Sequence, residues 1–153
     1  MKELRQKVRI ALTGPVCSIP TPFTADDEID FDAVAKMIDF QIASGFRMIF
    51  LTPGNSHYNS MNDAEMAAIC RFTVEHTRKR ALVCVTEFGH IAKRTFELAH
   101  FAKECGADLF LPFPCNWAGS ADIDSLADYY VETGKIIPLM LIFSPLGGTD
   151  AGI

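Results

Sequence analysis

The chain has 153 residues, of which 49% are hydrophobic and 22% are charged, so we expect one domain that can bury a core. A formal net charge of -5, with no basic stripe, argues against a nucleic-acid partner. The charged first residues lack the apolar centre of a signal peptide, and no apolar run is long enough to cross a membrane. We therefore expect a cytoplasmic protein without a nucleic-acid or membrane partner.

Five short apolar runs have the composition of parallel strands that are covered on both faces. They span residues 16–20, 47–52, 82–86, 109–112 and 139–143. Four helices are expected between them. They are marked by a cap at Asp30, a capping box from Asn62 to Glu65, a stop at Gly106 and a start at Asp122.

This regular alternation predicts an α/β fold with a parallel sheet and right-handed crossovers. Two architectures remain open at this point. One is a doubly wound open sheet, which five strands could complete, and the other is a (β/α)₈ TIM barrel, which typically needs about 250 residues. No glycine-rich phosphate loop follows the first strand, which disfavours a nucleotide-binding sheet.

The five cysteines have no metal-ligand spacing and lie mostly in apolar runs, so we expect free thiols in a reducing compartment and no metal site. Cys115 is a minor candidate for a catalytic thiol. The sequence shows no neighbour that would lower its pKa, which such a role requires.

The stretch around the end of the second strand is the candidate site, because polar residues after a parallel strand commonly form sites in such folds. The candidate substrate-binding residues are Thr52, Pro53, Gly54, Asn55 and Ser56, and the candidate acid–base residues are His57 and Tyr58. The alternative is an ordinary loop with a helix cap. Two further polar residues, Glu87 and His90, either face the same mouth or cap the next helix.

Several segments, in this order and spacing, resemble the dihydrodipicolinate synthase / N-acetylneuraminate lyase family over roughly residues 12–146. The segments are Gly14-Pro15-Val16, Pro20-Thr21-Pro22-Phe23, Asp30-Phe31-Asp32-Ala33, Gln41-Ile42-Ala43-Ser44-Gly45, Thr52-Pro53-Gly54-Asn55-Ser56, Ser60-Met61-Asn62-Asp63-Ala64-Glu65, Phe96-Glu97-Leu98-Ala99, Ala102-Lys103, Gly106-Ala107-Asp108 and residues 138–145.

The resemblance implies a (β/α)₈ barrel with a helical C-terminal extension and class I aldolase chemistry without a cofactor. In that family a lysine on the sixth strand forms a Schiff base with pyruvate or another 2-oxo acid. A tyrosine of the fifth strand moves protons through a threonine of the second-strand motif, which also holds the substrate carboxylate. A protonated imine is an electron sink, so C–C bond cleavage or formation becomes feasible near neutral pH.

The match at the site positions is partial. Thr52 matches the first threonine of the motif, whereas Pro53 replaces the second and Asn55 replaces a glutamate. Ile142 falls at the tyrosine position, and the 153 residues contain no sixth strand with its lysine. The lysines Lys36, Lys93, Lys103 and Lys135 all fall on predicted helices or helix ends.

We therefore expect one incomplete barrel domain over residues 1–153, lacking strands six to eight and the C-terminal helical region. The parent activity implied is an aldolase-type lyase or synthase, and the chain as given is expected to lack it. One alternative is a non-catalytic, self-associating half-barrel that binds a small carboxylate or a partner chain, and another is a truncated product without function. Open strand edges and an uncovered inner face predict a homo-oligomer.

Overall fold

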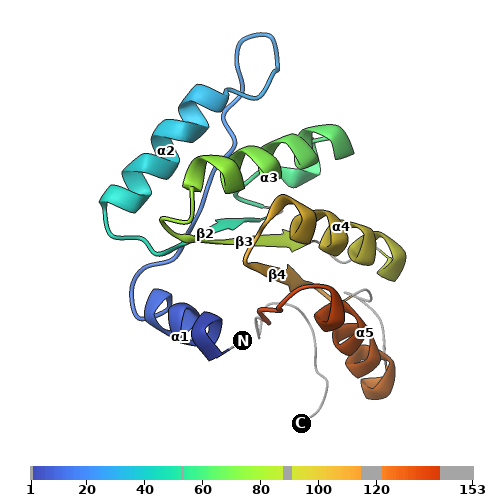
Figure 1. Ribbon diagram of the computed structural model, residues 1–153. Helices are drawn as coiled ribbons and strands as arrows, with labels where there is room; N and C mark the ends of the chain where they lie inside the picture. The colour runs from blue at the N-terminus through green and yellow to red at the C-terminus, as the bar shows by residue number, and fades with distance from the viewer. Residues whose placement is uncertain (1, 53, 88–90, 115–121, 142–153) are drawn as a thin grey trace.

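The computed structural model describes residues 2–52, 54–87, 91–114 and 122–141 (Figure 1). Helices and strands alternate along the chain from β1 to α5, as the pattern predicted. The elements are α1 (Lys2–Ala11), β1 (Cys17–Ser18), α2 (Phe31–Ala43), β2 (Met48–Leu51), the 3₁₀ helix η1 (Tyr58–Ser60), α3 (Asp63–Thr77), β3 (Leu82–Glu87), α4 (Ala92–Cys105), β4 (Leu109–Pro112) and α5 (Ile123–Ile136).

The strands form one parallel sheet in the order β1-β2-β3-β4. This sequential order, with a helix between successive strands, confirms the α/β class and is the order of strands in a barrel. The predicted fifth strand is present only as a single parallel bridge between Phe110 and Leu139. Residues 142–143 of that prediction lie outside the described residues.

Local side-chain chemistry starts and stops the helices where the sequence indicated. The carboxylates of Asp30 and Asp122 accept from backbone N–H groups of α2 and α5, and Asn62 and Glu65 form the predicted capping box of α3. Gly106 ends α4 with φ at 89°, a left-handed conformation that glycine adopts without strain.

Helices α2 to α5 lie along one face of the sheet (Figure 1). A core of fully buried side chains joins the two layers, because alternate residues of each strand point toward the helices. The strands contribute Ile49, Leu51, Val83, Val85 and Phe110, and the helices contribute Val34, Ile38, Ile69, Cys70, Ala99 and Ala102.

The other face of the sheet, which would line the interior of a barrel, carries a second buried cluster made of Met48, Phe50, Cys84, Leu109 and Leu111. The expectation that this face would be uncovered is wrong. Helix α1 packs Leu4, Val8 and Ala11 against the cluster, and Phe113 and Met140 also contact it. The sequence analysis missed α1, although these three residues have the i, i+4, i+7 spacing of a helix face.

No helix in the described ranges is long and apolar enough to span a membrane.

Candidate functional site

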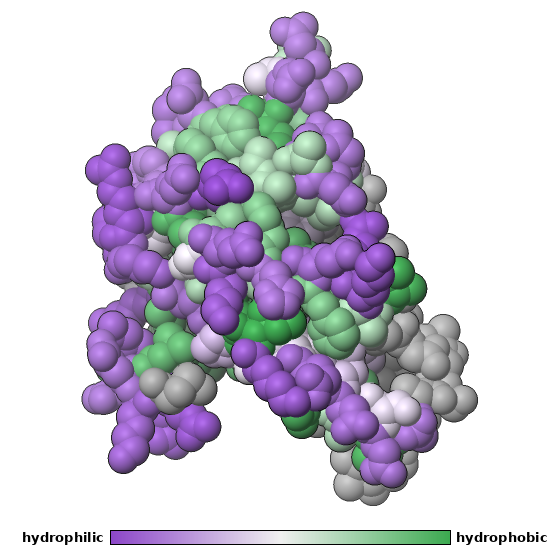
Figure 2. All heavy atoms as spheres, turned by 45° about the vertical axis from the view of Figure 1, so that its right-hand side comes forward, coloured by the Kyte–Doolittle hydropathy of each residue, from purple (hydrophilic) through white to green (hydrophobic). Residues whose placement is uncertain are grey.

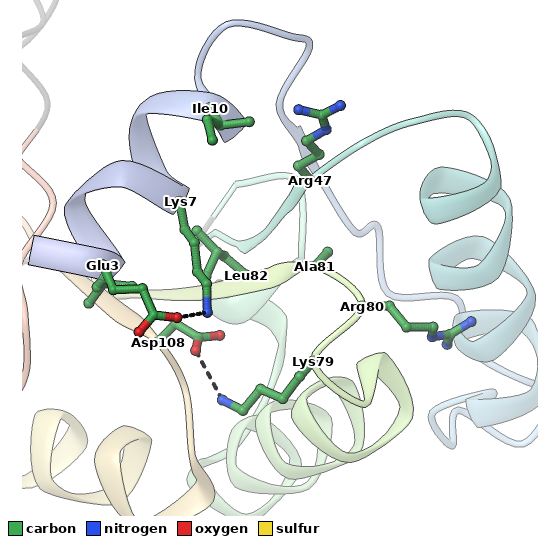
Figure 3. Close-up of a pocket in the computed structure, with 10 residues that line it drawn as sticks. Glu3, Lys7, Ile10, Arg47, Lys79, Arg80, Ala81, Leu82 and Asp108 are labelled. Atoms are coloured by element: carbon green, nitrogen blue, oxygen red, sulfur yellow. Dashed lines mark hydrogen bonds and ion pairs between the residues drawn. The ribbon is translucent and has the colours of Figure 1, made fainter.

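The two ends of the parallel sheet differ in chemistry. A pocket of about 530 Å³ lies between α1 and the starts of β2 and β3 (Figure 3). Two ion pairs lie in its wall: Lys7 Nζ lies 2.7 Å from Glu3 Oε1, and Lys79 Nζ lies 3.0 Å from Asp108 Oδ1. Asp108 also accepts from the N–H of Val83, so its carboxylate joins the start of β3 to Lys79.

At the opposite end, the loop after β2 is held by Ser56, whose side chain is fully buried. Its Oγ donates to the carbonyl of Ile19 at 2.6 Å and accepts from the N–H of Thr52 at 2.9 Å. Thr21 Oγ1 in turn donates to the carbonyl of Ser56 at 2.7 Å. Two of these bonds fix the loop after β2 to the segment after β1, and the third, from Thr52, shapes the loop from within.

Next to this buried turn the loop presents an exposed polar group. Gly54, Asn55 and His57 are all exposed, and Thr52 is half-buried. Asn55 Nδ2 donates to Ser18 Oγ at 2.8 Å, which brings together the carboxyl ends of β1 and β2. His57 has a left-handed backbone with φ at 57°. Pro53 lies outside the described residues.

Tyr58 points into the core, whereas its neighbour His57 is exposed. The Oη of Tyr58 lies 3.4 Å from Cys70 Sγ, and burial raises the pKa of Tyr58 well above its ordinary value. Burial also raises the pKa of the Cys70 thiol from 9.0 to about 12. The acid–base roles assigned to His57 and Tyr58 stay predictions, and of the two side chains only that of His57 is exposed.

The end of β3 lies one strand further along the same edge. Glu87 is buried, and Thr95 in the first turns of α4 donates to its Oε2 at 3.1 Å. This contact ties the strand end to α4, but it is not the predicted cap, because α4 begins after Ile91 without a side-chain cap bond. The other candidates of this edge, His90 and Cys115, lie outside the described residues.

Every lysine of the sequence is exposed and belongs to a helix or a helix end. These lysines are Lys2, Lys7, Lys36, Lys79, Lys93, Lys103 and Lys135.

Four cysteines, Cys17, Cys70, Cys84 and Cys105, are free thiols, as predicted. Within the part of the chain that the structure describes, no group of His, Cys, Asp and Glu side chains is placed to hold a metal ion.

The arrangement can bind an anion rather than attack a substrate. Ser18 Oγ accepts from Asn55 and still has its own proton to donate, and the amide of Asn55 has a second N–H. Sequence reasoning placed Ser18 inside a strand and did not select it. The feature that could have indicated Ser18 is its position at the end of β1, because the neighbouring strand β2 leads into the candidate loop.

Residues 11–132 match the dihydrodipicolinate synthetase family. YagE of Escherichia coli (strain K12), provisionally named as a 2-dehydro-3-deoxy-D-gluconate aldolase, is 31% identical over 142 residues, which cover 90% of this chain and 46% of YagE. The 4-hydroxy-tetrahydrodipicolinate synthase of Herminiimonas arsenicoxydans is 32% identical over 100 residues, which cover 65% of this chain and 34% of that protein.

The crystal structure of YagE in complex with pyruvate superposes with a TM-score of 0.77 and 27% identity over 86% of this chain and 45% of YagE. The fold of dihydrodipicolinate synthase from Aquifex aeolicus is also similar, with a TM-score of 0.75 at 22% identity over 88% of this chain and 46% of that one. The chain thus spans less than half the length of these relatives, and its sheet corresponds to part of their barrel. By its sequence and its fold, the chain belongs to the dihydrodipicolinate synthetase family.

Proposed function

We propose that the barrel of which this chain forms a part acts on pyruvate or another small 2-oxo acid, as an aldolase-type lyase or synthase. Membership of the family supports this proposal, and so does the similarity to YagE, whose crystal structure contains pyruvate. In this proposal the chain contributes the part of the site that binds the substrate carboxylate.

The observation that carries the proposal is the exposed Asn55–Ser18 pair beside Gly54, at the carboxyl ends of two neighbouring strands. Side-chain N–H and O–H donors make charge-assisted hydrogen bonds to a carboxylate, which are about twice as strong as neutral ones. Glycine at this position lets the ligand approach the backbone closely. Thr52 and Ser56 position the loop, and exposed His57 is the adjacent acid–base group.

We further propose that residues 1–153 by themselves bind the carboxylate without forming an imine. A Schiff-base lysine needs a desolvated or electropositive pocket that lowers its pKa, and each lysine here is exposed on a helix or a helix end. A second candidate function is therefore carboxylate binding without C–C bond chemistry.

Titration of the ¹⁵N-labelled chain with pyruvate tests the carboxylate site. We expect amide shifts at Gly54 and Asn55, and a dissociation constant at least about tenfold weaker in Asn55→Ala, which corresponds to about 1.4 kcal/mol. Ser60→Ala, at an exposed serine outside this pair, is the matched control and should bind as the wild type does. Shifts confined to the opposite end of the sheet would contradict the proposal.

Borohydride reduction in the presence of pyruvate tests the chemistry separately. The intact mass of the chain should stay unchanged, because reduction traps an imine as a stable adduct only where one forms. A stoichiometric adduct on one lysine would show that the chain has its own Schiff-base site and would exclude the purely binding function.

A further inference from the structure

Thr86 is a buried polar residue at the carboxyl end of β3, one of the two central strands of the sheet. It is only 1% exposed. On the face that Figure 2 shows, hydrophilic side chains lie over the outer surfaces of the helices, and a hydroxyl in the interior needs a hydrogen-bond partner instead of water. Thr86 has such a partner, because its Oγ1 donates to the carbonyl of Leu51 on β2 at 2.7 Å.

The side chain of Thr86 lies on the inner face of the sheet, beside Thr52. Successive residues of a strand point to opposite faces, and Cys84, two residues before Thr86, belongs to the inner cluster. The register of β2 and β3 pairs Leu51 with Val85, so the next position places Thr52 opposite Thr86. Thr52 begins the site loop and is half-buried. The two threonines are therefore neighbours at the carboxyl ends of the central strands.

The peptide group between Leu51 and Thr52 is held at both of its polar atoms. Its carbonyl accepts from Thr86, and its N–H donates to Ser56 Oγ at 2.9 Å. Ser56 Oγ in turn donates to the carbonyl of Ile19 at 2.6 Å. These bonds run from β3 across the end of β2 to the segment after β1. A hydroxyl on each side fixes the plane of the peptide, and with it the direction in which the site loop leaves the strand.

We propose that Thr86 is a positioning residue of the candidate carboxylate site. Its hydroxyl holds the Leu51–Thr52 peptide in the orientation from which Thr52 and the following loop reach the ligand. The inference rests on the proposed function, since it assigns Thr86 to the same site. It does not involve an edge of the sheet, because β2 and β3 each pair with a strand on both sides.

A positioning role has a consequence that simple packing does not have. Without the Thr86 bond the peptide can rotate, and only a fraction of the molecules then hold the loop in its binding geometry. The apparent dissociation constant rises as the inverse of that fraction. Loss of the hydroxyl should therefore weaken ligand binding and loosen the Thr52 peptide together, while the distant parts of the same strands keep their order.

Titration of ¹⁵N-labelled Thr86→Val with pyruvate tests this role, because valine keeps the branched shape of threonine and lacks only the hydroxyl. We expect a dissociation constant about three- to tenfold above that of the wild type, the range that loss of one neutral hydrogen bond gives. Thr86→Ser keeps the hydroxyl and should restore wild-type binding. The matched control is Thr73→Val on α3, which should bind as the wild type does. Thr73 is also fully buried, but its Oγ1 has no hydrogen-bond partner among the described residues.

Amide hydrogen exchange without ligand gives a second readout. In Thr86→Val the N–H of Thr52 should exchange about three- to tenfold faster than in the wild type, because the peptide opens locally. The N–H groups of Ile49 and Val83, nearer the starts of the two strands, should keep their wild-type rates. An equal acceleration of all three amides would report a general loss of stability and would overturn the positioning role.

Unchanged pyruvate binding by Thr86→Val would overturn the inference and leave the carboxylate site in place, and so would equal weakening by Thr73→Val. A wild type that binds no pyruvate would contradict the proposed function instead, and the exchange of the Thr52 amide would still decide whether Thr86 holds the peptide. If Thr86→Val does not fold, the wild type supplies the test. Its Thr86 hydroxyl proton should exchange slowly with water, and rapid exchange would overturn the inference.

Discussion

Replacement of Ser56 by alanine should destabilise the protein more than any change on the loop surface. The hydroxyl of Ser56 is fully buried and makes two hydrogen bonds, to the carbonyl of Ile19 and from the N–H of Thr52. Ser56→Ala removes both bonds and leaves a buried acceptor and a partly buried donor without this partner. The buried acceptor costs about 1–3 kcal/mol and the partly buried donor about 1 kcal/mol, so we expect a loss of about 2–4 kcal/mol.

This loss is large against the roughly 5–15 kcal/mol that stabilises a typical domain. Near this chain length, 1 kcal/mol corresponds to about 2–4 °C, so the melting temperature should fall by about 4–16 °C. Urea unfolding followed by circular dichroism measures the change directly. The protein concentration must be held constant, because association would contribute to the apparent stability.

Ser60→Ala is the control, because Ser60 is exposed in the same loop, and it should change stability by less than about 0.5 kcal/mol. Thr21→Val removes only the single bond to the Ser56 carbonyl and should have an intermediate effect of about 1 kcal/mol. If Ser56→Ala and Ser60→Ala unfold at the same urea concentration, the loop is not held by this hydroxyl and the account of the site is incorrect.

Two further predictions follow from caps and thiols. Asn62→Ala should lower the free energy of unfolding by about 1 kcal/mol, because it removes the cap of α3, whereas Asn62→Asp should keep most of this stability. Equal losses of stability in the two variants would argue against capping. Because burial raises the pKa of Cys70 from 9.0 to about 12, the unfolded thiol ionises first as pH rises, and stability should fall between these two values. Between pH 8 and pH 10 the stability advantage of wild type over Cys70→Val should shrink by about 1.4 kcal/mol, and a constant difference would contradict a buried neutral thiol.

The sequence predicted the central strands well because their apolar runs are continuous. β2, β3 and β4 lie within one residue of the expected ranges, since strands covered on both faces have little choice of residue type. β1 is shorter than expected, at Cys17–Ser18, and within the described residues the last strand is a single bridge at Leu139. Both lie at sheet edges, where pairing on one side gives fewer hydrogen bonds and weaker constraints on the sequence.

The details of the site could not be read from the chain because they depend on contacts distant in sequence. Ser56 and Asn55 were selected for their position after β2, but their partners Ile19 and Ser18 are 37 residues away. No local pattern distinguishes a serine whose hydroxyl is buried in the turn from one that faces a ligand. The substrate-binding roles of Thr52, Pro53, Gly54, Asn55 and Ser56 accordingly remain predictions.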